Sequence, residues 1–572
     1  MTQRITEHVV EAIVQEGWGD VLSSYEDVSF TKNPKFGDLQ SNHAFLIGKK
    51  IRTNPRQVAQ KVAERLQSQI DFARIEVAGP GFLNFFLSND WLTQHLKEQV
   101  CDTHVGIIQS GQGKTMVIDY SSPNIAKRMH IGHMRSTIIG NAIDRMYRSA
   151  GWNVVADNHI GDWGTQFGKL IVSWDRDCNQ EAFEKDPIGE LERLYVSFAQ
   201  SATEEDMELA RKETVKLQQG DERNRALWKT FIDESMKEFE KVYARLGIEF
   251  DVVYGESFYH NDLAPLVQNL MENGIATASD GAKVIAFSSQ ETPKMLSDTV
   301  LIVQKADGAF LYGTTDIATL NFRMSSFAPD RIIYVTDLRQ QLHFQQVFSA
   351  WRRNMEETSL PELVHVWFGM LKLQKGAMSS RKGNVIRLVD LINEGVRRAK
   401  EVTDSKSMHL SEEEKEQVSE AVGVSAIRYA DLVQNPQTDV QFSWDKLLSL
   451  EGNTAPFLMY SYARARGIQR KAGVDCPQVS ALAISSDHER TLVLSLLKFP
   501  NAVEHALHGN KPNILCDYLY ELCSSFNRFY ADSPVLSAEE EIKNSRLALV
   551  EASLRVLQKC FSLLGIHALD RM

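Results

Sequence analysis

Two histidines, a glycine and a lysine stand close together in the stretch SSPNIAKRMHIGH, residues 121–133: Lys127, His130, Gly132 and His133. A zinc-protease pair places its histidines at i and i+4 with a glutamate between them, whereas here the spacing is i and i+3 and the motif contains no carboxylate. Imidazole and ammonium N–H groups can instead donate to phosphate oxygens, and a glycine lets a nucleotide approach the backbone closely. The motif therefore favours phosphate binding over metal binding.

The segments around this motif predict a β–α–β unit. The apolar run MVIDY, residues 116–120, is typical of a strand, and residues 133–150 have helical periodicity. Gly151 is suited to end that helix, and WNVVADN, residues 152–158, predicts the next strand. Such a unit implies a parallel sheet, in which a loop leading into a helix N-terminus is a favourable place for an anion.

Length and charge limit the classes of protein to consider. A chain of 572 residues is too long for one hydrophobic core and predicts three or four domains. No apolar run approaches the roughly 20 residues that cross a bilayer, and residues 1–19 lack the layout of a signal peptide. We therefore expect a cytoplasmic protein. A net charge of −12 argues against indiscriminate coating of nucleic acid but leaves room for local basic patches.

Two other patterns do not support a site. The six cysteines are scattered without a CxxC pair, so neither a structural zinc site nor a disulfide framework is supported, and we expect reduced, mostly buried thiols. SGQGKT, residues 110–115, lacks the spacing of a phosphate-binding loop, so we interpret it as a linker.

The pattern of elements changes along the chain. Strand-like runs return at TVLIV, AFLYGT and RIIYVT, and helical periodicity dominates from about residue 412 onward. The expected units are an N-terminal α/β domain (1–112), a catalytic domain (113–375) with a helical insertion at about 180–248, a connecting segment (376–411) and a helical domain (412–572).

Five blocks in a fixed order resemble one known family. HIGH at 130–133 resembles the first signature of class I aminoacyl-tRNA synthetases, and SSPNIAKRMHIGH resembles its arginyl-tRNA synthetase version. The later blocks are NHIGDWGTQFG (158–168), LYGTTDIA (311–318), DLRQQLHFQQVF (337–348) and MSSRKGNVIRL (378–388), the last at the place of the second signature, KMSKS. FGD, AGPGFLNF, EGNTAPFLMYSYARAR and LLGIHALDRM extend the resemblance to both ends of the chain.

The resemblance implies an arginine–tRNA ligase. ATP would activate L-arginine to arginyl-adenylate, and the arginyl group would pass to the 3′-terminal ribose of tRNA(Arg), releasing AMP and diphosphate. ATP with Mg²⁺ would be a substrate, and we expect no zinc, no prosthetic group, no DNA, no membrane and a monomer. Activation would require tRNA. The implied fold is α/β plus all-α: a Rossmann-like, HIGH-bearing catalytic domain with a parallel sheet, an N-terminal α/β tRNA-binding domain and a C-terminal helical-bundle anticodon-binding domain.

Matching positions give an expected arginine site. A guanidinium is a planar set of donors that favours carboxylates, so Asp119 and Asp316 would face it. The residues expected to complete the arginine site are Tyr312, Gln340, Ser122, Asn124 and His159.

The second signature departs from the family pattern, because Ala377 and Ser380 stand where KMSKS has its lysines. We expect Lys127 to supply the ammonium that is lost there. Arg128, where the family often has proline, receives no role. The expected catalytic residues are Lys127, His130, His133, Ser379, Arg381 and Lys382, and the expected ATP-binding residues are His130, Gly132, His133, Met370 and Val385.

The helical domain carries the expected RNA contacts Tyr460, Arg464 and Arg466, which combine stacking surfaces with phosphate-binding charges. Two alternatives stay open at this point. One is a nucleotidyltransferase of the same fold that adenylates a small acid without RNA, and the other is a non-catalytic RNA-binding paralogue.

Overall fold

The computed structural model describes residues 1–21, 28–67, 73–290, 293–355, 360–373, 376–377, 386–407, 410–442, 447–475 and 477–572. The second signature falls largely in a gap. The predicted residues Ser379, Arg381, Lys382 and Val385, together with Ser380, lie outside the described residues.

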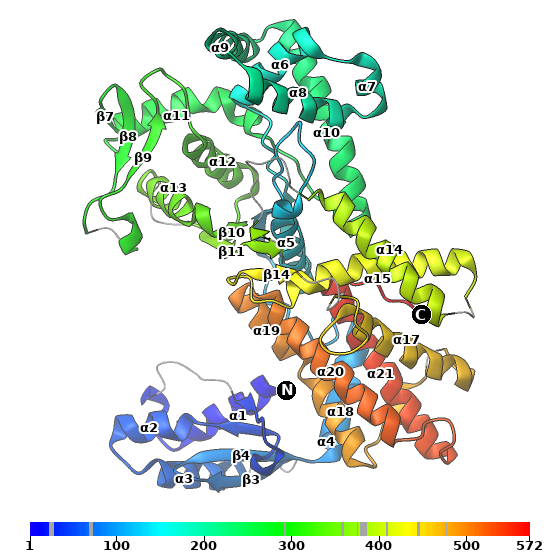
Figure 1. The fold of residues 1–572 in the computed structure, drawn as a ribbon. Helices are drawn as coiled ribbons and strands as arrows, with labels where there is room; N and C mark the ends of the chain where they lie inside the picture. Colours follow the sequence, from blue (N-terminus) through cyan, green and yellow to red (C-terminus); the bar gives the residue numbers. More distant parts are fainter. Residues whose placement is uncertain are drawn as a thin grey trace.

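The first unit is a four-stranded antiparallel sheet of order β1-β2-β4-β3 beside helices α1, α2 and α3 (Figure 1). Its short strands are β1 (Ser29–Phe30) and β2 (Leu39–Ser41). Its longer strands are β3 (Ala73–Ala78) and β4 (Phe82–Leu87). The helices are α1 (Thr2–Gln15), α2 (His43–Ile51) and α3 (Pro55–Gln67), and α4 (Asn89–Cys101) leads out of the unit.

The central sheet is parallel throughout and has the order β11-β10-β5-β6. Its strands are β5 (Thr115–Asp119), β6 (Asn153–Asp157), β10 (Arg331–Asp337) and β11 (Glu362–Phe368). Helix α5 (Ile131–Ser149) joins β5 to β6, so the predicted β–α–β unit is confirmed. Because β5 pairs with β6 on one side and with the distant β10 on the other, the strand order reverses beside β5, which is where open α/β sheets bind ligands.

Helices follow β6, with side chains capping several of their N-termini. They are α6 (Thr165–Asp177), α7 (Gln180–Lys185), α8 (Pro187–Ser201), α9 (Glu204–Gln219) and α10 (Glu222–Leu246). Asp186, Thr203 and Asp221 cap α8, α9 and α10, and Gly220 and Gly247 end the last two in the left-handed conformation. In Figure 1 these helices form the top of the molecule, and α10 runs down towards α14.

A second insertion precedes β10. It contains the antiparallel sheet β7-β8-β9, with β7 (Thr277–Ser279), β8 (Ala282–Ala286) and β9 (Val300–Gln304), and the helices α11 (His260–Glu272) and α12 (Tyr312–Phe327). The prediction of a strand at AFLYGT is wrong. Phe310 makes only an isolated β-bridge to Gln304, and Tyr312 already begins α12. A short apolar run does not by itself distinguish a strand from the start of a buried helix.

The C-terminal part is helical, as expected. Its helices are α14 (Leu388–Lys406), α15 (Glu412–Leu432), α17 (Ala455–Ala472), α18 (Asp487–Leu497), α19 (Phe499–Gly509), α20 (Pro512–Asp532) and α21 (Glu540–Leu564). One short strand, β14 (Val440–Phe442), pairs with β12 (Leu371–Leu373) of the catalytic part. Cys516, Cys523 and Cys560 are free and buried among these helices. Within the described ranges, no helix is long and apolar enough to cross a membrane.

Candidate active site

The two histidines of HIGH form the N-terminal cap of α5. The backbone N–H of Gly132 donates to Nδ1 of His130 at 3.0 Å, and the backbone N–H of His130 donates to Nδ1 of His133 at 3.1 Å. The rings are stacked with centroids 3.9 Å apart. A Cβ on residue 132 would stand 2.7 Å from the His130 ring, so this close packing requires glycine.

These hydrogen bonds also settle where the imidazole protons are. Because Nδ1 of each ring accepts from a backbone N–H, the proton of each neutral ring is on Nε2. Burial lowers the pKa of His133 to about 3, with further contributions from His130 and Lys127, and burial followed by Lys127 lowers the pKa of His130. The site therefore contains two neutral N–H donors at a helix N-terminus at physiological pH.

The loop before the cap has an unusual backbone. Ser121, Ser122 and Ala126 have φ values of 74°, 49° and 63°, a region that non-glycine residues rarely adopt. Helix α10 anchors both ends of this stretch: Tyr243 OH lies 2.8 Å from Ser121 Oγ, and Ser235 Oγ accepts from the Ala126 N–H at 2.9 Å. A strained loop that is held this firmly is typical of a ligand-binding segment.

Lys127 lies at the end of this loop. Its Nζ is 4.3 Å from the centroid of the Tyr195 ring on α8, and its charge contributes to the lowered pKa of both histidines. In the part of the chain that the structure describes, no carboxylate forms an ion pair with this ammonium. Its positive charge therefore remains available to an anion beside HIGH.

A cleft opens in front of the cap. Its lining residues are His130, Ile131, Gly132, Arg135, Asp337, Arg339, Phe368, Gly369, Met370 and Leu371. The predicted ATP-binding residue Met370 thus shares this cleft with His130 and Gly132. The segment after the second signature returns to the same place, since the Ile131 N–H donates to the Ile386 carbonyl at 3.1 Å and the Leu388 N–H to the Met129 carbonyl at 2.9 Å.

Sequence reasoning assigned no role to Asp337 and Arg339. Arg339 donates to Asp337 through its backbone N–H at 2.8 Å and its guanidinium at 2.8 and 2.9 Å. Burial opposes ionisation of Asp337, but these bonds outweigh it and lower the pKa of this carboxyl. The signal in the sequence is a polar pair directly after RIIYVT, at the carboxyl end of a buried strand.

A second, acidic region is centred on Asp316 in α12. His343 Nε2 of α13 (Gln341–Arg353) lies 2.5 Å from Asp316 Oδ2. The ring of Tyr312 lies 4.6 Å from the His343 ring, and Tyr312 itself is 64% exposed. Gln340, directly before α13, is also exposed. Tyr312 thus packs beside His343, which contacts Asp316, and both Tyr312 and Gln340 are open to solvent.

Glu256 is a candidate that sequence reasoning missed. It begins the 3₁₀ turn Glu256–Tyr259, and burial raises its pKa to about 7. His159 opposes this shift, whereas the charges of Asp162 and Asp316 add to it. A half-buried carboxyl whose charged neighbours are mainly other carboxyls is a site prepared for a cation. The sequence signal is slight: an acidic residue after glycine in YGESFY.

Asp119 is bonded within the protein. Arg323 of α12, which is fully buried, places its NH2 group 2.6 Å from Asp119 Oδ2 and 2.7 Å from Asp157 Oδ2. The other oxygen of Asp119 accepts from the Ser122 hydroxyl at 2.9 Å. One guanidinium of the protein thus joins the ends of β5 and β6. The assignment of Asp119 to the arginine site stays a prediction, and so does that of Ser122.

Asn124 and His159 lie on neighbouring segments. Residue 124 forms a bridge to Gly161, whose Cβ, if it had one, would come within 2.3 Å of Asn124 Oδ1. His159 Nδ1 is buried and has no hydrogen-bond partner among the described residues. His159 also influences the pKa of Glu256, so it lies beside the acidic region.

A groove far from the cleft contains two of the three predicted RNA contacts. The guanidinium of Arg464 lies between the rings of Tyr460 and Tyr530, 4.8 and 5.0 Å from their centroids. Tyr460 and Tyr530 are 45% and 42% exposed, and Arg470, Lys471 and the C-terminal Met572 also line the groove. Arg466 instead pairs with Asp570 at 2.9 Å. Tyr530 was missed because it lies on α20, remote in sequence from Tyr460 on α17.

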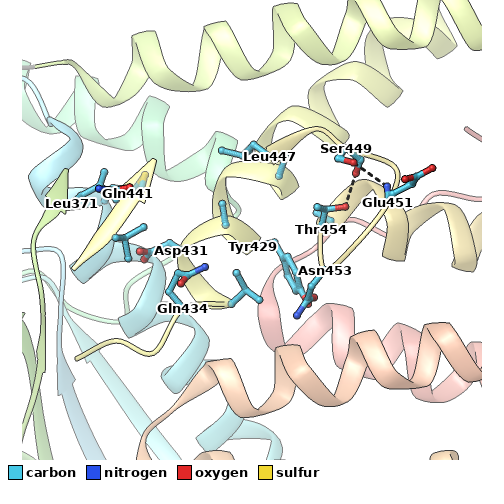
Figure 2. Close-up of a pocket in the computed structure, with 16 residues that line it drawn as sticks. Leu371, Tyr429, Asp431, Gln434, Gln441, Leu447, Ser449, Glu451, Asn453 and Thr454 are labelled. Carbon is cyan, nitrogen blue, oxygen red and sulfur yellow. Dashed lines mark hydrogen bonds between the residues drawn. The ribbon is translucent and has the colours of Figure 1, made fainter. Parts of the chain in front are cut away.

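The cavity in Figure 2 lies at the junction of the catalytic and helical parts, between α15, β14 and the start of α17. It shares Leu371 with the cleft, and Met134 of α5 forms part of its wall. Asp431, one of its lining residues, makes a buried ion pair with Arg135 at 2.8 Å. None of the predicted site residues is among the described residues that line it, so this cavity is distinct from the candidate active site.

Three family models match the chain. The family described as "Arginyl tRNA synthetase N terminal domain" matches residues 3–87, "tRNA synthetases class I (R), catalytic domain" matches 95–444, and "DALR anticodon binding domain" matches 458–572. The catalytic match runs past residue 411, where the sequence predicts the start of the helical domain.

Curated relatives and solved structures agree with these matches. An arginine–tRNA ligase of Fusobacterium nucleatum is 45% identical over 556 residues, covering 96% of this chain and 95% of the relative. That of Shewanella putrefaciens is 40% identical and covers 100% and 99%. The crystal structure of arginyl-tRNA synthetase from Plasmodium falciparum has a TM-score of 0.82 at 30% identity and covers 100% of this chain and 99% of that one. The Thermus thermophilus arginyl-tRNA synthetase structure has the same TM-score at 22% identity, with full coverage of both chains, a likeness of fold alone.

Proposed function

Because the chain belongs to the family of class I arginyl-tRNA synthetases, its activity is the ATP-dependent ligation of arginine to tRNA, and we propose that the cleft beside HIGH and the neighbouring acidic region perform the activation step. The family resemblance and the predicted fold class, a parallel-sheet catalytic domain with an N-terminal α/β unit and a helical C-terminal domain, are confirmed. The two alternatives, a nucleotidyltransferase without RNA and a non-catalytic paralogue, are set aside.

One observation supports this division of labour: the site has two regions of opposite electrostatic character. Lys127 and the Nε2–H groups of His130 and His133 favour an anion, and Asp316 and Glu256 favour a cation. ATP phosphates suit the first region and the arginine guanidinium suits the second.

The chemistry follows from that placement. A carboxylate oxygen of arginine attacks the α-phosphorus of ATP, and the bond to diphosphate breaks, which gives arginyl-adenylate. Negative charge grows on the phosphate oxygens during this step, and the two imidazole N–H groups and the Lys127 ammonium stabilise it. A ribose hydroxyl of tRNA(Arg) then attacks the arginyl carbonyl and releases AMP.

Further roles are proposed from the same placement. Met370 and Gly132 would contact ATP, which enters with Mg²⁺, and Ser122, Asn124 and His159 would hold the arginine backbone groups. Tyr312 and Gln340, which are exposed, would close over bound arginine. No group of three or more His, Cys, Asp or Glu in the described ranges is placed to hold a metal. We also propose that the protein acts as a cytoplasmic monomer.

The groove with Tyr460, Arg464 and Tyr530 is proposed to bind the anticodon loop of tRNA. Two exposed aromatic rings on either side of a guanidinium offer stacking surfaces to unpaired bases, and each stacked base contributes about 1–3 kcal/mol. Arg466, paired with Asp570, would have to leave that partner to contact RNA.

Pyrophosphate exchange with arginine, lysine and citrulline tests the proposal, with and without tRNA(Arg). Citrulline is a neutral near-isostere of arginine, so it leaves the carboxylates of the acidic region without a cation, and we expect it to be rejected by about 10⁴-fold in kcat/KM. Exchange should also depend on tRNA. Comparable exchange with citrulline would contradict the assignment of the acidic region to the guanidinium.

A further inference from the structure

Helix α8 of the insertion touches the loop before HIGH at successive points. Tyr195 lies under the Lys127 ammonium, with 4.3 Å between Nζ and the ring centroid. One turn earlier on the same face, Glu192 Oε1 accepts from the Arg128 backbone N–H at 2.7 Å. At the start of the helix, the Arg128 guanidinium donates to both oxygens of Asp186 at 2.5 and 2.6 Å.

The same helix reaches the end of the second signature. Glu192 Oε2 lies 3.6 Å from the Arg387 guanidinium and 3.8 Å from that of Arg128. Arg387 belongs to the segment that pairs with the backbone around His130. Glu192 therefore connects the two segments that enclose the proposed phosphate site.

The type of residue beneath Lys127 matters. A carboxylate there would neutralise the ammonium and compete with phosphate for its N–H groups. An aromatic face attracts the cation through the ring quadrupole, leaves its charge in place and leaves N–H groups free to donate to an anion. A lysine held in advance also loses less side-chain entropy when it engages phosphate.

We propose that Tyr195 is a positioning residue for the activation step: its ring holds the Lys127 ammonium, without neutralising it, where ATP phosphates bind. Tyr195 acts through Lys127 and contacts no reacting atom. This inference rests on the proposed function, specifically on the role of Lys127.

The test replaces Tyr195 in the full-length enzyme by phenylalanine and by mono-, di- and trifluorophenylalanine. Each fluorine weakens the quadrupole while changing the shape little, so folding is preserved across the series. In tRNA-dependent exchange, phenylalanine should stay within about twofold of tyrosine, and kcat should fall stepwise to about 3- to 30-fold lower with the trifluoro residue. The KM for arginine should not change.

Two controls make the result specific. In a Lys127→Ala background, kcat should not change across the fluorinated series, because no ammonium remains for the ring to hold. The second control is the same series at Phe183 of α7, whose ring packs edge-on against Trp174 with centroids 4.8 Å apart. There, kcat should not change across the series in the wild-type background.

The outcomes separate this inference from the proposed function. Suppose that Lys127→Ala lowers kcat, but that kcat does not change across the fluorinated series at residue 195, or changes by the same factor in the wild-type and Lys127→Ala backgrounds. Positioning by Tyr195 is then overturned, and the role of Lys127 stands. If Lys127→Ala keeps the wild-type kcat, positioning by Tyr195 and the role of Lys127 are both overturned.

Discussion

The two regions of the site are built in different ways. Around HIGH, the polar groups are two neutral imidazoles and one ammonium, and they come from seven consecutive positions at the start of a helix. Around Asp316, the groups are carboxyls and histidines from separate segments of the chain, among them Glu256, Asp316 and His343. The first region is fixed by local backbone geometry and the second by tertiary packing.

This difference also determines how each region tolerates its own charge. The imidazoles stay neutral because burial lowers their pKa, so Lys127 is the only charged group of these three. In the acidic region, burial raises the pKa of Glu256, and the charges of Asp162 and Asp316 add to this shift. Mutations should therefore affect the rate of activation in the first region and arginine affinity in the second.

The largest expected effect is that of Lys127→Ala. Losing one donor that acts on developing phosphate charge should lower kcat for activation by roughly 10²–10³. The KM for arginine should stay within about twofold, because the contact is made to ATP. Steady-state exchange at saturating ATP measures both values. If Lys127→Ala instead raises the arginine KM and leaves kcat unchanged, Lys127 contributes to arginine binding and the two regions do not differ in the way proposed.

Asp316→Asn should have the opposite signature. Removing one carboxylate charge from a half-buried cation site is expected to remove roughly 3 kcal/mol, which raises the arginine KM about 100-fold. The KM for ATP should remain near the wild-type value. The variant keeps the size of the side chain, so an unchanged arginine KM would mean that Asp316 does not face the guanidinium.

The sequence predicts the two regions unequally well, for physical reasons. HIGH is a contiguous helix cap, so residue types and spacing are enough to place it. Tyr195 and Glu256 meet the site only through folding, and no local pattern links them to it. Arg323 was missed although it lies seven residues after Asp316 on α12, two turns along the same face, and pairs with Asp119. An arginine within a largely buried helix was the available signal.

A smaller effect is expected from pH. Glu256 has a pKa of about 7, raised above its ordinary value, so it becomes protonated as pH falls through 7 and loses the charge that attracts arginine. The arginine KM should rise by up to about tenfold per pH unit below 7, and binding should take place with release of a proton. Glu256→Gln should raise the KM about tenfold at pH 8 and flatten its dependence between pH 6 and 8. The KM for ATP, measured in parallel, is the control. If the arginine KM of Glu256→Gln still depends on pH between 6 and 8, a group other than Glu256 causes that dependence.

The smallest expected effect comes from His343, whose Nε2 lies 2.5 Å from Asp316 Oδ2. If this hydrogen bond orients the carboxylate for arginine, His343→Phe should raise the arginine KM about three- to tenfold, since one hydrogen bond to a charged group is lost while the ring still packs against Tyr312. His343→Gln retains a donor and should recover part of that loss. Neither variant should change kcat for activation, because His343 belongs to the acidic region. The opposite result is equally informative: if His343→Phe lowers the arginine KM, the histidine competes with the guanidinium for Asp316, and the acidic region of the free enzyme is closed by its own side chain until the substrate displaces it.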